Sequence, residues 1–173
     1  MSQPTGANAV AMPRTQASGP RLDARTPFAE LESQHAYLRG CLADLRAMVL
    51  GSDPRPDEEV RLKIESARGS LALHFTFEEN VGSMHYLLAA WPGLEPELAH
   101  LRAEHVEFLA TLDRAAAALR AGAAQTDVAN TVLLVLDRLI DHELDERQLL
   151  RITLRFGDSG RWRKQTLGRR DLP

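Results

Sequence analysis

The sequence predicts an all-α fold, an antiparallel up-down-up-down four-helix bundle. Four segments place apolar residues at alternating steps of three and four, which is the period of an amphipathic helix. Turns that contain Gly or Pro separate these segments, and no run of residues alternates in the way that is typical of a strand. The chain has 173 residues, of which 44% are hydrophobic and 5% aromatic, and this is enough to bury one helical core.

The first helix follows a segment that has no apolar period. Residues 1–25 are rich in Pro, Gly, Ser, Thr and Ala, so we expect a disordered, flexible tail. Thr26 and Pro27 then supply an N-cap and a proline at the first helical position. Gly51 ends this helix. Its predicted apolar face consists of Phe28, Leu31, His35, Leu38, Leu42, Leu45 and Val49.

The second helix is expected to run from about Asp57 to Pro92 and Gly93, after a turn at residues 52–56. Gly69 and Gly82 should weaken it locally without ending it. Its predicted apolar face consists of Val60, Ile64, Ala67, Leu71, His74, Glu78, Val81, His85 and Leu88.

Two further helices complete the bundle, which we expect to occupy residues 26–157. The third begins at about Glu95 and ends at Gly122, and the fourth is capped by Thr126 and ends at Gly157. Residues 158–173 are locally basic and aperiodic, so we expect a solvated second tail, with docking on a partner or polyanion as the alternative. The two predicted apolar faces consist of Leu94, Leu98, Leu101, His105, Phe108, Leu112, Ala115 and Leu119, and of Val128, Val132, Val135, Leu139, His142, Glu146 and Leu149.

Charge and composition exclude several partners. The formal net charge of -3 gives no basic bias, so we expect neither nucleic acid nor a membrane as a partner, and the sequence indicates no particular protein partner. The single cysteine, Cys41, excludes an internal disulfide framework and is expected to be a buried, inert thiol. The N-terminal segment lacks the apolar core of a secretory signal, and no apolar run is long enough for a membrane span. We therefore expect a cytoplasmic protein.

The polar residues on the four apolar faces are of only two kinds, His and Glu. A rise of ~1.5 Å per residue brings six of them to one height in an antiparallel bundle. These six are His35, His74, Glu78, His105, His142 and Glu146. Buried carboxylates and imidazoles are costly unless something satisfies them, and a metal would do so. A metal-free bundle whose polar residues satisfy one another is the alternative.

The number of possible ligands indicates two metal ions. Six N and O ligands exceed the needs of one tetrahedral zinc but suit two ions that share carboxylates. We expect Glu78 and Glu146 to be the bridges, and the four histidines to be terminal ligands. Imidazole with carboxylate favours iron among the redox metals, and manganese and zinc are alternatives.

Four motifs together resemble the hemerythrin family, specifically its branch with the HHE cation-binding domain. They are Leu31-Glu32-Ser33-Gln34-His35, His74-Phe75-Thr76-Phe77-Glu78-Glu79, Leu101-Arg102-Ala103-Glu104-His105 and His142-Glu143-Leu144-Asp145-Glu146. The resemblance implies a non-haem di-iron centre in a four-helix bundle. Members of the family carry or sense oxygen, respond to nitric oxide or iron level, or take part in iron–sulfur cluster repair.

Two departures from the oxygen-carrying members bear on function. Those members place a histidine where this chain has Leu101, and an aspartate where it has Arg147, whereas Glu146 stands one residue earlier. The resemblance thus implies a protein that binds or senses a small ligand (oxygen, nitric oxide or peroxide) more than a reversible carrier or a dedicated enzyme. A di-iron oxidase or an iron-donating repair protein is one alternative, and a purely structural interaction module is another.

Several neighbouring residues have less specific interpretations. His85 is expected at the end of the bundle or in a channel, and His100 at the solvated rim, with metal ligation as the alternative for each. Glu79 and Glu104 are interpreted as exposed carboxylates, with hydrogen bonding to a ligand imidazole as the alternative. Phe75, Phe77 and Phe108 are expected to pack around the site.

Overall fold

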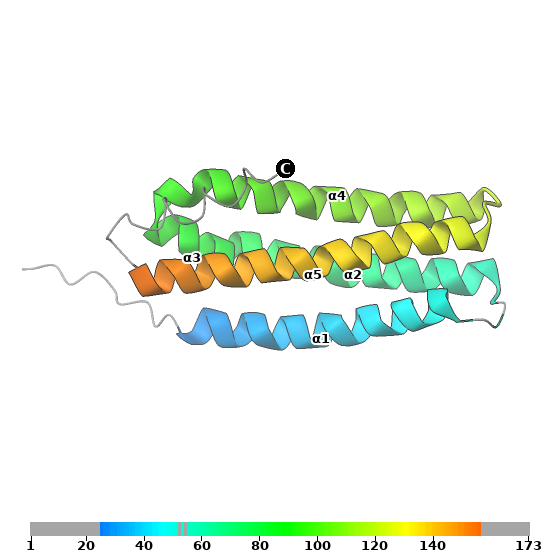
Figure 1. The fold of residues 1–173 in the computed structure, drawn as a ribbon, viewed down its shortest axis with the longest axis horizontal. Helices are drawn as coiled ribbons and strands as arrows, with labels where there is room; N and C mark the ends of the chain where they lie inside the picture. Colours follow the sequence, from blue (N-terminus) through cyan, green and yellow to red (C-terminus); the bar gives the residue numbers. More distant parts are fainter. Residues whose placement is uncertain (1–24, 52, 54, 157–173) are drawn as a thin grey trace, which may run out of the picture.

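The structure is a computed structural model that describes residues 25–51, 53 and 55–156. Residues 1–24 and 157–173, which hold nearly all of the two predicted tails, lie outside the described residues. Four long helices run side by side, and each is antiparallel to the one before it (Figure 1). They are α1 (Arg25–Leu50), α2 (Asp57–Asn80), α4 (Glu95–Arg120) and α5 (Gln125–Phe156). The predicted all-α bundle is confirmed.

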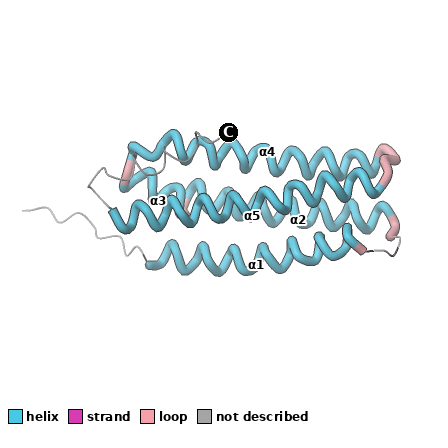
Figure 2. The backbone as a smooth tube through the Cα atoms, viewed as in Figure 1, coloured by secondary structure: helices cyan, strands magenta, loops and turns pink. Residues whose placement is uncertain are grey.

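The packing of the helices surrounds a single central axis. Helix α1 packs against α2 and α5, and α4 packs against the same two helices. The connections lie at the two ends of the bundle, so the middle of every long helix faces only other helices or solvent (Figure 2). A short helix, α3 (Ser83–Ala90), and a 3₁₀ turn (Pro92–Leu94) cover one end. None of the described helices has the length and the apolar character that crossing a bilayer demands.

The predicted second helix is wrong at Gly82, where the chain turns and begins α3. The N–H groups of Val81 and Gly82 both donate to the carbonyl of Phe77, at 2.9 and 2.7 Å. A Cβ atom on Gly82 would lie 2.9 Å from the Cα of Glu78, which is closer than real Cβ atoms approach, so only glycine fits. The turn therefore brings residue 82 against the backbone of Glu78.

This turn changes which residues face the core. Met84 and Leu87 are buried, whereas Val81 is 63% exposed and His85 is exposed. The predicted apolar face is wrong for Val81, because this residue lies in the turn after the end of α2. It is wrong for His85, because the break at Gly82 shifts the helical phase of the residues that follow.

Helix α5 also begins earlier than predicted, so Thr126 lies inside its first turn instead of capping it. The side-chain amide of Gln125 donates to the carbonyl of Arg55 at 2.7 Å and so joins two connections at one end of the bundle. Gly122, between α4 and α5, has a φ of 79°, a conformation that favours glycine.

Two apolar clusters form the core. The larger includes Leu38, Leu71, Phe108 and Leu139, and the smaller includes Leu31, Leu101 and Leu149. On α1, α4 and α5, the His and Glu residues of the predicted site stand between a member of one cluster and a member of the other. On α2, His74 and Glu78 follow Leu71 of the larger cluster, and Met84 of the smaller cluster comes next in α3. The polar layer is therefore sandwiched between two apolar layers that shield it from water.

Candidate metal centre

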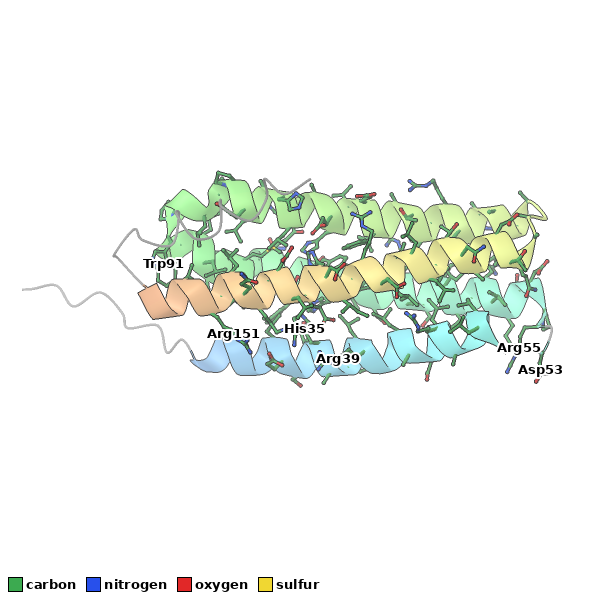
Figure 3. The ribbon with its side chains drawn as sticks, in the orientation of Figure 1. His35, Arg39, Asp53, Arg55, Trp91 and Arg151 are labelled. Atoms are coloured by element: carbon green, nitrogen blue, oxygen red, sulfur yellow. The ribbon has the colours of Figure 1, made fainter. Side chains whose placement is uncertain are left out.

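The structure brings all six predicted site residues into one buried layer. Helix α1 supplies His35, α2 supplies His74 and Glu78 one turn apart, α4 supplies His105, and α5 supplies His142 and Glu146. The most exposed of the six is His74, at 6%. In Figure 3 the side chain of His35 extends from α1 toward the other helices, at a height between the two ends of the bundle.

Glu78 lies at the centre of this layer. Its Oε1 is 2.8 Å from Nε2 of His74 and 3.4 Å from Nε2 of His35. Its Oε2 is 3.4 Å from Nε2 of His105. Each carboxylate oxygen therefore faces a different part of the layer.

Two groups of possible ligands share Glu78. One consists of His35, His74 and Glu78, and the other of Glu78, His105 and His142; the ligand atoms within each group lie within 4.8 Å of one another. Each group offers three ligands from at least two helices. A pair of ions could thus be held with Glu78 between them.

Glu146 lies beside the first group. Its Oε2 is 3.5 Å from Nε2 of His35, and its Oε1 accepts a hydrogen bond from the hydroxyl of Ser83. A bridging role for Glu146, as predicted, would require one of these oxygens to reach the second group as well. The geometry gives the central position to Glu78.

Three of the four imidazoles are held from behind, which means that the ring nitrogen facing away from the centre forms a hydrogen bond with a neighbouring side chain. The Nδ1–H of His105 donates to Glu79 at 2.7 Å, and that of His142 donates to Glu104 at 2.9 Å. The Nδ1–H of His74 donates to the amide oxygen of Gln34 at 3.1 Å. Carboxylate and amide oxygens only accept, so the proton of each neutral ring is on Nδ1 and its Nε2 carries a lone pair.

These lone pairs face other lone pairs. Nε2 of His105 lies 3.0 Å from Nε2 of His142, and Nε2 of His74 lies 2.8 Å from Oε1 of Glu78. Two acceptors at such distances repel each other unless a cation or a proton lies between them. The donor set therefore fits a metal.

Unpartnered polar atoms support the same fit. Within the described part of the chain, both ring nitrogens of His35, both oxygens of Glu78 and Oε2 of Glu146 are buried without a hydrogen-bond partner. Leaving a buried polar atom unsatisfied costs about 1–3 kcal/mol, and more for a charged group. A cation at the centre of the layer would offset this cost.

The pKa values show how the cluster distributes charge without a metal. Burial lowers the pKa of His35, but interactions with Glu146 and Glu78 outweigh burial and raise it from 6.5 to about 9. Burial raises the pKa of Glu78, but the imidazoles of His35 and His74 outweigh burial and lower it. Burial and the charge of Glu78 raise the pKa of Glu146. Burial lowers the pKa of His105. At neutral pH His35 is therefore a cation beside an ionised Glu78.

The interpretation of Glu79 and Glu104 as exposed carboxylates is wrong, and the alternative, hydrogen bonding to an imidazole, is correct. Each lies beside a site residue in sequence but contacts the imidazole of the next helix: Glu79 on α2 reaches His105, and Glu104 on α4 reaches His142. Sequence periodicity gives the direction of a side chain on its own helix and says nothing about which imidazole lies across from it.

Two further polar contacts were not predicted. The first is the hydrogen bond between Gln34 and His74, because the motif that contains Gln34 indicates only His35 as a ligand. Ser83 is buried against Glu146 because the chain turns at Gly82. The sequence offered one signal of this turn, which is Gly82 itself, since a glycine in an otherwise regular helical pattern can mark a break.

Aromatic and apolar side chains complete the walls. Phe75 stacks on His105 with ring centroids 3.8 Å apart, and Phe108 meets His142 edge-on at 5.5 Å. The predicted packing of these two rings around the site is confirmed, whereas Phe77 is only half-buried. Leu101 is buried in the smaller apolar cluster and offers no ligand. His100 is exposed, as expected of a rim residue, and Cys41 is half-buried.

Comparison with known proteins identifies the family. No curated protein and no solved structure matched the chain. A family model described as the hemerythrin HHE cation binding domain matches residues 26–151. The match spans nearly the whole described bundle and includes every residue of the polar layer. The chain therefore belongs to the hemerythrin family and contains its HHE cation-binding domain.

Proposed function

We propose that this protein is a non-haem di-iron protein that binds or senses a small ligand, namely oxygen, nitric oxide or peroxide, at a carboxylate-bridged site. The observation that carries the proposal is the position of Glu78, which the two groups of possible ligands share. His35, His74, Glu78 and Glu146 would hold one ion, and Glu78, His105 and His142 would hold the other. A bound iron would supply an open coordination position and a change of oxidation state.

The charge of the surrounding carboxylates suits two divalent ions. Glu78 and Glu146 face the centre, and Glu79 and Glu104 bind ligand imidazoles from behind. When ionised, these four carboxylates carry four negative charges, which equals the charge of two divalent cations. A buried cluster is most favourable when its charges balance in this way.

The surroundings of the second ion favour an open site. Its group offers three protein ligands, and the side chain one turn before His105 is Leu101, which packs in an apolar cluster. Iron commonly accepts more than three ligands, so a small molecule could occupy a remaining position. This supports ligand binding or sensing.

Metal content and ligand response test the proposal. The protein is loaded with iron(II) without oxygen, and we expect about two irons per chain and a visible absorption that changes when nitric oxide is added. Glu78→Ala should reduce binding at both positions, and His105→Ala at one. Glu32→Gln is the matched control, because Glu32 is an exposed carboxylate on α1 that forms no ion pair among the described residues. The proposal would be contradicted if the protein took up no iron and if Glu78→Ala changed neither the iron content nor the absorption.

An oxidase is the second candidate function, and the absence of a ligand at Leu101 favours it. A more open iron with carboxylate ligands is suited to reducing oxygen. Oxygen consumption by the iron-loaded protein with an added reductant tests this candidate, with Glu78→Ala as the inactive control.

A further inference from the structure

A cavity of about 230 Å³ lies between α1 and α2, next to the candidate metal centre. It is lined by Gln34, Tyr37, Leu38, Ser70, Leu73, His74 and Phe77. Tyr37 and Leu73 are 67% and 76% exposed, whereas Leu38 and His74 are buried. The cavity therefore runs from the surface to an imidazole of the centre.

His74 separates this cavity from the centre. The Nδ1 side of its ring faces Gln34, which also lines the cavity, and its Nε2 lies 2.8 Å from Oε1 of Glu78. His74 is also the most exposed of the six site residues. Of the imidazoles in the centre, this one is the closest to solvent.

The side chains that line the cavity favour the entry of an uncharged molecule. Leu38, Leu73 and Phe77 supply apolar walls, and none of the lining residues carries a carboxylate, an ammonium or a guanidinium group. At about 30 Å³ per water molecule, the cavity has room for a diatomic molecule. The cavity over α5, in contrast, is lined by Asp141, Asp145, Arg147 and Arg151 and by no site residue.

We propose that the cavity between α1 and α2 is the route by which a small uncharged molecule, of the size of nitric oxide or oxygen, reaches the centre on the side of the group His35, His74 and Glu78. Iron commonly accepts up to six ligands, so the ion that these residues and Glu146 would hold also keeps positions open. Gln34 and His74 form the inner end of the cavity, and the hydrogen bond between them narrows the passage. This inference rests on the proposed function, because a route matters only if the centre takes such a molecule.

The first test measures rates in the iron-loaded protein with nitric oxide as the probe. Leu73→Trp at the mouth and Ser70→Leu on the wall should narrow the route. In the part of the chain that the structure describes, neither side chain forms a hydrogen bond or an ion pair with a site residue, so the bound state should be unchanged. We therefore expect association and dissociation rates to fall by the same factor, about tenfold, with an unchanged Kd. Gln34→Ala should raise both rates.

Val106→Trp is the matched control, since Val106 is an exposed apolar residue on the outer face of α4. It should leave both rates unchanged. Iron content and far-UV circular dichroism establish that each variant is loaded and folded. Wild-type rates in folded, loaded Leu73→Trp and Ser70→Leu would overturn the proposed route.

The second test uses metal-free protein in D₂O and measures the exchange of the hydrogen on imidazole C2 for deuterium, which depends on the access of water to the ring. Peptide mass spectrometry should show that Leu73→Trp slows this exchange several-fold at His74. Exposed His100 is the internal reference and should exchange equally in all variants. Equal exchange at His74 in the wild type and in Leu73→Trp would overturn the route.

The two tests separate the route from the proposed function. If the wild-type loaded protein does not respond to nitric oxide, the proposed function fails, while the hydrogen exchange at His74 still reports on the cavity. If the wild type binds nitric oxide but Leu73→Trp and Ser70→Leu change neither the binding rates nor the exchange at His74, the route fails and the function stands.

Discussion

Oε1 of Glu79 on α2 lies 2.7 Å from Nδ1 of His105 on α4, and this contact joins two helices behind the candidate metal centre. An equivalent contact joins Glu104 on α4 to His142 on α5. The two imidazoles of the second ligand group are therefore both held by carboxylates, whereas His74 in the first group is held by the neutral amide of Gln34. The two groups of possible ligands therefore differ in the charge of the side chains that bind their histidines.

Removing a carboxylate behind a histidine should weaken metal binding. Glu79→Gln and Glu104→Gln leave a side chain of the same size but remove the negative charge that raises the basicity of the imidazole. Partners of this kind are worth about 10–100-fold in metal affinity. Competition with a metal chelator measures the change, and Glu32→Gln, which alters an exposed carboxylate on α1, should bind like the wild type. Full affinity in Glu79→Gln would mean that the contact only fills space.

Metal binding should stabilise the fold. A ligand at a free concentration of 100 times its Kd adds about 2.7 kcal/mol per site to the free energy of unfolding. For a chain of this size, that corresponds to a rise in Tm of roughly 5–10 °C. Thermal unfolding with and without iron(II) or a chelator checks the expectation. Glu78→Ala should lose most of the shift, because both groups contain Glu78.

Metal affinity should rise with pH. A metal binds the neutral imidazole, yet the pKa of His35 in the metal-free protein is raised to about 9, so binding must displace a proton at pH 7. Apparent affinity should therefore increase by up to about tenfold per pH unit from pH 7 and level off above about pH 9. Titration at several pH values, or proton release measured with an indicator dye, checks this. An affinity that does not depend on pH would show that His35 does not release a proton to the metal.

The same pKa shift has the opposite consequence for the metal-free fold. The pKa of His35 in the folded protein lies above its ordinary value of 6.5, so protonated His35 adds to the free energy of unfolding. This contribution is fully present below about pH 6.5. It should be lost as the pH rises through about 9. Urea unfolding of the metal-free protein at pH 6.5 and pH 9.5 measures the difference, and a higher stability at pH 9.5 would contradict it.

Gly82→Ala should destabilise the protein and disturb the centre. The added Cβ would lie 2.9 Å from the Cα of Glu78, so the backbone must shift at a cost of about 1–3 kcal/mol. The shift would also move Ser83, whose hydroxyl holds Glu146. Urea unfolding and iron content check both effects.

Gly40→Ala is the matched control for this variant. Gly40 lies in the interior of α1, and its added Cβ would meet no atom within 4 Å. This substitution should stabilise the protein by about 0.5–1 kcal/mol and leave iron content unchanged. Equal effects of the two substitutions would mean that the close approach at Gly82 has no consequence.

The amino-acid sequence alone predicts the bundle and the residues of the polar layer. Apolar residues at steps of three and four predict the helices, and the constant rise per residue sets the height of each His and Glu along its helix. His35, His74, Glu78, His105, His142 and Glu146 could be brought to one height by this reasoning alone. These quantities depend on local helical geometry, which the sequence period reports directly.

The contacts between side chains of different helices depend on how the helices pack, and the sequence did not predict them. Periodicity shows which face of a helix is buried, but not which side chain of a neighbouring helix lies opposite. The pairing of Glu79 with His105, the central place of Glu78 and the contact between Gln34 and His74 all depend on that neighbour. The turn at Gly82 depends on it too, because the glycine is required by the approach of one backbone segment to another, and such an approach leaves no period in the sequence.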